Sequence, residues 1–467
     1  MRTECFVMLI AGCASSGSES PMGAKAVSEA DADTDADTDA DTDADTDADT
    51  DADTDADTDI EPEPAFVLTF ELDLARADGN PLSGFFTSYQ WAEPVTDMPE
   101  SLEYVIVPLA DMMIGPDDFS FASGLEPYLL AAEARGNQVV LRPYIDYPSL
   151  PSGLPTYLEG QVDQFAYSDF GGGWSPDYTD PALRAAMDAF IAALGDQYDG
   201  DPRIGVVQLG LLGFWGEWHT WPHSEWFPDV SIQNDVLHAY HDAFASTLLQ
   251  VRIPTGDSPS LRIGFHDDSF AYSTVGDVPW FFVPLLEAAE ADARWTEVPV
   301  GGELRPELQD QVFDASYEEG EFQQDFDACV QATHASFLLN FHAFSGIYDP
   351  EEQARARESA RMMGYAYHLE RAVLEAGTLT LSIENHGVAP FYQPLQVTLS
   401  DGHGASVSAE VPPVLPEMPA AVSLDATSLD APGEGEPWAL RLHSDAVLPA
   451  AMVRWATVPA DGPLRFE

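Results

Sequence analysis

Basic residues are scarce in this chain of 467 residues. Lys and Arg number 18 against 81 Asp and Glu, which gives a formal net charge of -63 at pH 7. Such a surface repels phosphate backbones and anionic lipid headgroups, so the composition argues against a nucleic-acid-binding role. The same charge favours solubility and says nothing about the fold.

Cysteine and long apolar runs are also scarce. The three cysteines, Cys5, Cys13 and Cys329, define no disulfide framework. The apolar run Phe6–Ala11 is too short to span a bilayer as a helix. It leads into Ile10-Ala11-Gly12-Cys13, which resembles the bacterial lipobox, a signal that is cut before a cysteine that then becomes acylated.

We therefore predict a lipoprotein signal peptide over residues 1–12 and a membrane anchor through lipid on Cys13. The expected location is the outer membrane or cell surface. The alternative is a chance cysteine after small residues.

A tether is predicted after the signal, over residues 13–65. Between 31 and 59 the sequence repeats Asp-Ala-Asp-Thr and contains no apolar residue larger than Ala. Like charges at every second position and the lack of large apolar groups exclude a buried core, so we expect disorder. A calcium loop is disfavoured, because the glycine turn and terminal bidentate Glu of such loops are missing.

From Phe66 onward, apolar runs alternate with amphipathic stretches. After a lead-in strand over Val67–Leu74, eight strands are expected at Thr87–Trp91, Tyr104–Leu109, Gln138–Tyr144, the run that begins at Val206, Leu261–His266, Thr296–Val300, Ser336–Phe341 and Tyr365–Leu369. Helices are expected between them, including Leu125–Arg135, Pro181–Tyr198, Gln233–Arg252, Pro279–Ala293, a stretch within 306–332 and Pro350–Met363.

This alternation predicts the α/β class, with a (β/α)8 TIM-like barrel over residues 66–372. An open doubly wound sheet is the alternative, but no glycine-rich phosphate loop follows the first strand. From 373 to 467 the helical patterns stop. Short strands at Thr378–Glu384, Leu395–Leu399, Trp438–Leu442 and Met452–Trp455, separated by Pro and Gly, predict a small C-terminal β-sandwich.

The stretch Val206–Trp221, VVQLGLLGFWGEWHTW, stands out within the barrel. It begins as a continuous apolar run, typical of a strand buried on both faces, and then breaks at glycines. A carboxylate among indoles at a strand end is costly to bury unless something pairs with it. Flat indole faces suit stacking on sugar rings. The alternative is an aromatic loop that only packs.

Polar side chains gather at the predicted carboxyl ends of the strands, where the active sites of such barrels lie. By position, the candidates are Arg142, Tyr144, Trp215, Glu217, Trp218, His219, His266, Asp267, Asp268, Glu303, Asn340 and His342, with Trp174 in the 145–180 loop.

Two carboxylates on different strands suit cleavage of a glycosidic bond. Glu217 is the expected acid/base, Glu303 the first candidate for its partner and Asp267 the second. Arg142 could keep one carboxylate ionised. We expect the other candidates to contact substrate.

Structural interpretations remain open for several of these residues. Arg142, Asp267 and Asp268 could form an ion-pair network that braces the barrel. His219, His266 and His342 could be structural histidines, and the Trp174 loop could be plain surface. Zinc bound by His266, Asp267 and His342 is an alternative without diagnostic spacing. No cofactor or metal is predicted.

A family resemblance is carried by several segments: NPLSGFF, VVLRPY, DGDPRIGVVQLGLLGFWGEWHT, IGFHDDSF, VPVGGE, MGYAYHL and SIENHGVAPF. They resemble a secreted bacterial family of unknown function (domains of unknown function 4874 and 4832) over roughly residues 66–467. The resemblance implies a glycoside-hydrolase-like barrel, an immunoglobulin-like C-terminal domain and a carbohydrate setting, without a demonstrated activity.

One departure concerns the retaining-glycosidase clan that the barrel most resembles. That clan usually places its acid/base after strand four, commonly as Asn-Glu, and its nucleophile after strand seven. Here Gly216 precedes Glu217, and Glu303 follows strand six by the count above. Either a strand is miscounted, the mechanism differs, or catalysis has been lost.

The sequence thus predicts a cell-surface lipoprotein that hydrolyses or processes poly- or oligosaccharide with a carboxylate pair. The alternative is a non-catalytic carbohydrate-binding or adhesion lipoprotein on the same scaffold. A second carboxylate near Glu217 would favour the enzyme. A lone Glu217 tied to Arg142 would favour the binder.

Overall fold

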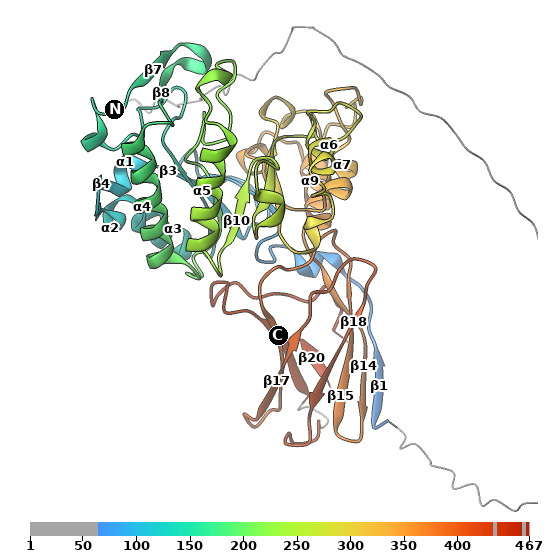
Figure 1. Ribbon diagram of the computed structural model, residues 1–467. Coiled ribbons are helices and arrows are strands. Elements are labelled where there is room, and N and C mark those ends of the chain that lie inside the picture. Colours follow the sequence, from blue (N-terminus) through green and yellow to red (C-terminus); the bar gives the residue numbers. More distant parts are fainter. Residues whose placement is uncertain (1–63, 433–436, 460–463, 467) are drawn as a thin grey trace, which may run out of the picture. The chain divides into compact units, whose positions relative to one another are not determined.

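The computed structural model describes residues 64–432, 437–459 and 464–466 (Figure 1). The predicted signal peptide, Cys13 and the predicted tether up to residue 63 lie outside the described residues. Within the described part of the chain, no helix has the length and apolar character needed to cross a membrane.

Eight parallel strands form the barrel. In chain order they are β2 (Gly84–Phe86), β3 (Leu102–Pro108), β6 (Gln138–Tyr144), β9 (Ile204–Gln208), β10 (Leu248–Val251), β11 (Gly264–Phe270), β12 (Val300–Leu304) and β13 (Ala335–Leu339). Each pairs with its neighbours in sequence, and β13 pairs with β2. A bridge between Thr87 and Glu103 joins β2 to β3 and closes the ring. The predicted fold class is confirmed.

Helices cover the barrel. They are α1 (Leu109–Met112), α2 (Phe121–Gly124), α3 (Glu126–Arg135), α4 (Pro181–Tyr198), α5 (Val230–Ala243), α6 (Phe282–Ala288), α7 (Phe326–Thr333), α8 (His342–Ser345) and α9 (Pro350–Met362). An Asp caps α4, α5, α7 and α9, its carboxylate accepting backbone N–H groups of the first turn. Two hairpins, β4 (Met113–Gly115) with β5 (Asp118–Phe119) and β7 (Gln164–Tyr167) with β8 (Gly173–Pro176), extend the loops.

The sequence-based strand count was wrong at one point. The helix expected over Gln233–Arg252 ends at Ala243, and its last part is β10, the fifth strand. Every later strand therefore moves up by one, so that β12, which contains Glu303, is strand seven. The strand expected at Tyr365–Leu369 does not belong to the barrel.

That segment is the start of β14 (Tyr367–Glu375), which lies in the sandwich. One sheet holds β1 (Phe66–Thr69), β14, β15 (Thr378–Asn385) and β18 (Ala420–Asp425). The other holds β17 (Ser406–Val411), β16 (Leu395–Ser400), β19 (Trp438–His443) and β20 (Leu464–Phe466). The expected lead-in strand is therefore shorter than predicted and pairs antiparallel with β14.

Alternating burial explains this sandwich. Leu379, Leu381 and Ile383 of β15 are fully buried, and the residues between them are not. The inner face of β16 meets them in one apolar cluster.

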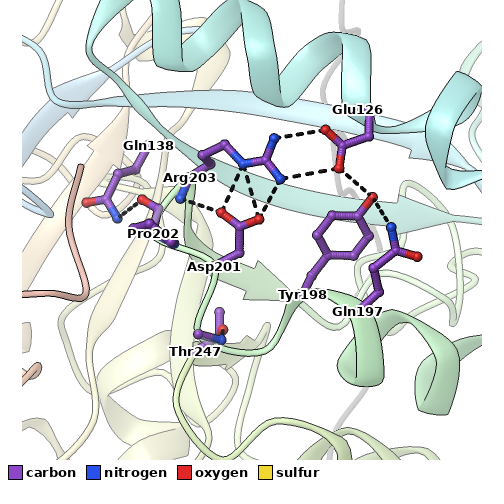
Figure 2. A network of polar contacts seen from close by, with 9 residues as sticks. Glu126, Gln138, Gln197, Tyr198, Asp201, Pro202, Arg203 and Thr247 are labelled. Atoms are coloured by element: carbon purple, nitrogen blue, oxygen red, sulfur yellow. Dashed lines mark hydrogen bonds and ion pairs between the residues drawn. The ribbon is translucent and has the colours of Figure 1, made fainter. Parts of the chain in front are cut away.

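A polar network braces the amino-terminal ends of the barrel strands (Figure 2). The Arg203 guanidinium contacts Glu126 at 2.8 Å and Asp201 at 2.5 Å. The Tyr198 hydroxyl donates to Glu126 at 3.0 Å. The DGDPRI segment therefore contributes to stability at the end of the barrel opposite the predicted site.

Candidate active site

Glu217 lies in the loop after β9, the fourth strand. The chain turns tightly there, and the Glu217 N–H donates to the Phe214 carbonyl at 2.8 Å. Gly216 allows this turn, because its φ is +69° and a Cβ there would lie 2.3 Å from the Gly210 carbonyl oxygen. The glycines of GFWGEW thus shape a turn that leaves the Glu217 side chain 12% exposed.

Arg142, on strand three, holds this carboxylate. Its Nη1 lies 2.9 Å from Glu217 Oε1. The same guanidinium donates through Nε to Gln208 Oε1 at 2.8 Å and stands 5.3 Å from the centroid of the Tyr104 ring. Arg142 is buried, so its guanidinium places a fixed positive charge next to the Glu217 carboxylate.

Glu303 is the second carboxyl group at this end of the barrel. Burial, together with the charges of Glu217 and Asp268, raises its pKa to about 8, while Arg142 and Arg305 oppose the shift. Among the described residues, no cationic side chain lies within ion-pair distance of Glu303. The two glutamates therefore interact through their charges while only Glu217 has a direct cationic partner.

A second ion pair stands beside the first. Arg252 Nε lies 2.7 Å from Asp268 Oδ2. Burial would raise the pKa of Asp268, but Arg252, His219 and His266 hold it well below its ordinary value. Burial and the charges of Arg142 and Arg252 keep the pKa of His266 well below its ordinary value, so His266 is neutral.

One set of these side chains has the spacing of metal ligands. Among the described residues, Glu217, His219 and Asp268 offer ligand atoms that all lie within 4.8 Å of one another. Both carboxylates already face arginines, so positive charge is present without a metal. The zinc set considered from the sequence, His266, Asp267 and His342, does not form such a group among the described residues.

The Asp267 side chain binds residues at the end of β11 and in the loop that follows it, and not the groups around Glu217. Its carboxylate accepts from the Thr274 hydroxyl at 2.6 Å and from the Ser269 N–H at 2.9 Å, and the residue is 3% exposed. Burial raises its pKa to about 7. The expectation that Asp267 contacts substrate or partners Glu217 is therefore corrected.

Three further candidates are buried or partly buried, and two of them, Asn340 and Trp218, make local side-chain hydrogen bonds. Asn340, fully buried, accepts from the Ala343 N–H at 3.3 Å and donates to Tyr348. His342 follows it in α8, and burial lowers the pKa of its imidazole. Trp218 is 3% exposed and its indole N–H donates to a carbonyl, so its ring belongs to the core and is not open to a ligand.

Aromatic rings of the loop that carries Glu217 contact a ring of the 145–180 loop. Phe170 contacts Trp215 and Trp221, with ring centroids 4.9 and 6.0 Å apart, and Trp221 is 43% exposed. We call Phe170, Trp215 and Trp221 the inner platform. Trp174, on the β7–β8 hairpin, is 54% exposed. The 145–180 loop therefore brings aromatic side chains to the loop that carries Glu217.

Two residues at the site were missed from the sequence. Burial, together with the charges of Glu303 and Glu217, raises the pKa of Tyr147 above its ordinary value. Its ring packs on Tyr144, whose own side chain is buried. The second is Arg252, which the sequence-based prediction placed at the end of the helix expected over Gln233–Arg252. Its position directly after the apolar LLQV would have revealed it as a strand-end residue.

A large cavity lies elsewhere. It has a volume of about 530 Å³ and is lined by residues that include Thr247, Arg262, Tyr392 and His443. These residues lie near the amino-terminal ends of β9 and β10 and in the sandwich, so the cavity is separate from the two glutamates.

No protein-family model matches the chain, and no curated protein matches it. The resemblance to the secreted bacterial family therefore stays a prediction. Solved structures with a similar arrangement include endo-glycoceramidase II from Rhodococcus sp., at 12% identity and TM-score 0.38 over 77% of this chain and 100% of that one.

Two others are a family 39 glycoside hydrolase from Bacteroides cellulosilyticus WH2 and GH5_18 from Bifidobacterium longum subsp. longum ATCC 55813. The first shows 10% identity and TM-score 0.37 over 75% of this chain and 82% of that one. The second shows 13% identity and TM-score 0.34 over 56% and 69%. Nothing about activity follows from similarities of this size.

Proposed function

We propose that this chain is a glycoside hydrolase that cleaves poly- or oligosaccharide with Glu217 and Glu303. The observation that carries the proposal is the pair of glutamates at the ends of strands four and seven, coupled through their charges but with different cationic surroundings. Hydrolysis of a glycosidic bond needs one carboxylic acid and one carboxylate, and this asymmetry supplies both.

The two roles follow from the surroundings of each group. Glu303, with a pKa near 8, keeps its proton at neutral pH and donates it to the leaving glycosidic oxygen as the bond to the anomeric carbon breaks. We assign Glu217, which faces the Arg142 guanidinium at 2.9 Å, the role of the carboxylate that attacks the anomeric carbon or takes a proton from the attacking water.

This assignment reverses the role expected for Glu217 from the sequence. The corrected strand count agrees with the clan pattern of carboxylates after strands four and seven, although that clan uses the strand-four carboxylate as the acid/base. In this chain the raised pKa of Glu303 and the contact of Glu217 with Arg142 support Glu303 as the acid and Glu217 as the carboxylate.

Turnover on a panel of soluble polysaccharides and alkyl glycosides, whose leaving groups need protonation, tests the proposal. We expect Glu217→Gln and Glu303→Gln each to lower the rate at least 100-fold. The matched control is Glu103→Gln. Glu103 is buried and has a pKa raised by burial to about 7, but it faces Arg135 near the start of strand two. Undiminished turnover in both active-site variants would rule the mechanism out.

A non-catalytic carbohydrate-binding protein is the second candidate. One observation favours it: the Glu217 carboxylate is already occupied by Arg142 at 2.9 Å. The presence of Glu303 within electrostatic reach favours the enzyme. Binding of a glycan without release of reducing ends would identify the binder.

We further propose that the chain is a lipoprotein anchored at the outer membrane or cell surface through Cys13. The lipobox-like Ile10-Ala11-Gly12-Cys13 and the acidic repeat of residues 31–59 support this proposal. The anchor would hold the barrel near extracellular glycans.

A further inference from the structure

A second group of aromatic rings stands at the strand-six and strand-seven side of the barrel. Tyr272 stacks on Phe322 with centroids 4.9 Å apart and planes 30° apart, and Phe322 lies 6.2 Å from Trp280 at 21°. Trp280 is 53% exposed. We call Tyr272, Phe322 and Trp280 the outer platform. None of the three was singled out from the sequence.

The outer platform is held firmly although it is built from two loops. The buried Gln324 side chain joins them, accepting from the Thr274 and Val275 N–H groups at 2.9 and 3.0 Å and donating to the Val275 carbonyl at 2.6 Å. Phe281, fully buried, packs edge-on against Trp280 with centroids 4.7 Å apart. Asp267 fixes the same loop to β11 through Thr274. An exposed indole on so ordered a base loses little conformational freedom when it binds a ligand.

Arg305 connects the outer platform to the glutamates. Its guanidinium stands 4.7 Å from the centroid of the Tyr272 ring, and its charge acts on Glu303, two residues earlier in the chain. Arg305, directly after β12, therefore places the platform beside the end of the strand that carries Glu303.

The inner and outer platforms lie on different sides of the two glutamates. The inner platform belongs to the loops after β6 and β9, strands three and four, while the outer platform belongs to loops after β11 and β12, strands six and seven. In a closed ring of eight strands, strands three and seven are diametrically opposite. A ligand that contacts both platforms must cross the barrel mouth.

We propose that Trp280, with Phe322 and Tyr272 beneath it, is a second sugar-binding site, and that the chain therefore binds internal segments of a polysaccharide instead of single terminal sugars. This inference rests on the proposed function for the identity of the ligand. A pyranose ring presents an apolar face of C–H groups to the indole, and its hydroxyl groups suit the acidic surroundings better than an anionic ligand would.

Affinity gel electrophoresis in laminarin, xylan, galactomannan, glucomannan and hydroxyethyl cellulose tests this site without requiring turnover. We expect at least one of them to retard the full chain, and Trp280→Ala to weaken that retardation about tenfold. Trp280→Phe should restore part of it. The matched control is Tyr128→Ala, which removes a 37% exposed ring on α3. Thermal unfolding of each variant checks that the fold is intact.

The outcomes separate this inference from the proposed function. Weaker binding by Trp280→Ala without hydrolysis by the wild-type chain supports the platform and rejects the enzyme. If the wild-type chain hydrolyses a polysaccharide and Trp280→Ala hydrolyses it at the same rate, the proposed hydrolase activity is supported and sugar binding at the outer platform is overturned. The platform is also overturned if none of the five polysaccharides retards the wild-type chain.

Discussion

Arg142 Nη1 lies 2.9 Å from Glu217 Oε1, and the two side chains are only 5% and 12% exposed. A cation on strand three thus meets a carboxylate after strand four in surroundings that exclude most water. Such a pair is costly to form and costlier to break, because either partner left alone would be a buried charge.

The first prediction concerns this pair. Arg142→Met should destabilise the fold by about 3 kcal/mol, since it leaves the Glu217 charge without its partner. In the Arg142→Met/Glu217→Gln double variant the loss should be smaller than the sum of the single losses by about 1–3 kcal/mol. Urea unfolding of the four proteins measures this coupling, and simple additivity would contradict it.

Glu303→Gln should stabilise the protein at alkaline pH. In the unfolded chain this carboxyl loses its proton near pH 4.5, whereas in the folded chain it holds the proton up to about pH 8. Between these values the folded state binds more protons, so stability falls as pH rises through that window. Because Gln cannot ionise, the variant should gain about 2 kcal/mol over wild type at pH 8.5 and little at pH 4. If the variant and the wild type have the same melting temperature at pH 8.5 as well as at pH 4, the raised pKa of Glu303 is contradicted.

The pH dependence of turnover should report Glu303 as the proton donor. We expect kcat/KM on an alkyl glycoside to fall above pH about 8, where Glu303 loses its proton. With a dinitrophenyl leaving group, which departs without protonation, Glu303→Gln should keep much of the rate of bond cleavage and Glu217→Gln should not. The reverse result would restore Glu217 as the acid.

Arg203→Met should separate stability from activity. The guanidinium joins Glu126 to Asp201 at the end of the barrel opposite the glutamates, so its loss should cost about 2 kcal/mol and leave kcat/KM unchanged (Figure 2). Arg203 holds the pKa values of Glu126 and Asp201 below their ordinary range. The stabilisation from these two carboxylates is present above the pKa values they have in the unfolded chain, and it is lost as the pH falls through their folded pKa values. The free energies of unfolding of the variant and the wild type should therefore become equal in acid. A change in kcat/KM would show that the two ends of the barrel are coupled.

Cys13→Ala tests the predicted anchor. If Cys13 carries the lipid, the variant should leave the membrane fraction and lose labelling by a fatty-acid analogue, while its barrel keeps full turnover. Unchanged membrane association would refute the lipoprotein proposal. Cys329→Ala is the matched control, because this buried cysteine is remote from the signal.

The barrel was predictable from sequence because its strands are short apolar runs between amphipathic helices. The missed strand β10 shows the limit of that reasoning. Between Ala243 and Leu248 no Gly or Pro marks a turn. The turn is made by Asp199, whose carboxylate accepts the N–H groups of residues 245, 246 and 247 at 3.0, 2.9 and 2.8 Å. A partner more than 40 residues away leaves no local signal.

The candidate site was predictable in position but less so in detail. In the structure Arg142 contacts Glu217, Arg252 contacts Asp268, and the charges of Glu217, Asp268 and Arg142 act on Glu303. Asp267 was misplaced because adjacent residues of a strand face opposite sides, and the string His266-Asp267-Asp268 does not say which side is the barrel interior. The raised pKa of Glu303 depends on burial and on charges from other strands, which only the folded chain brings near it.

The pairing of β1 with β14 has a consequence for biosynthesis. Phe66 lies opposite Leu374, so a strand made at the start of the described chain must wait for roughly 300 residues to be synthesised before its partner exists. At about 5–20 residues per second, translation of the intervening barrel takes on the order of 15–60 s. The barrel can therefore fold while the nascent sandwich still lacks its remaining strands. Until then β1 is an unpaired strand whose free backbone N–H and C=O groups can pair with another chain.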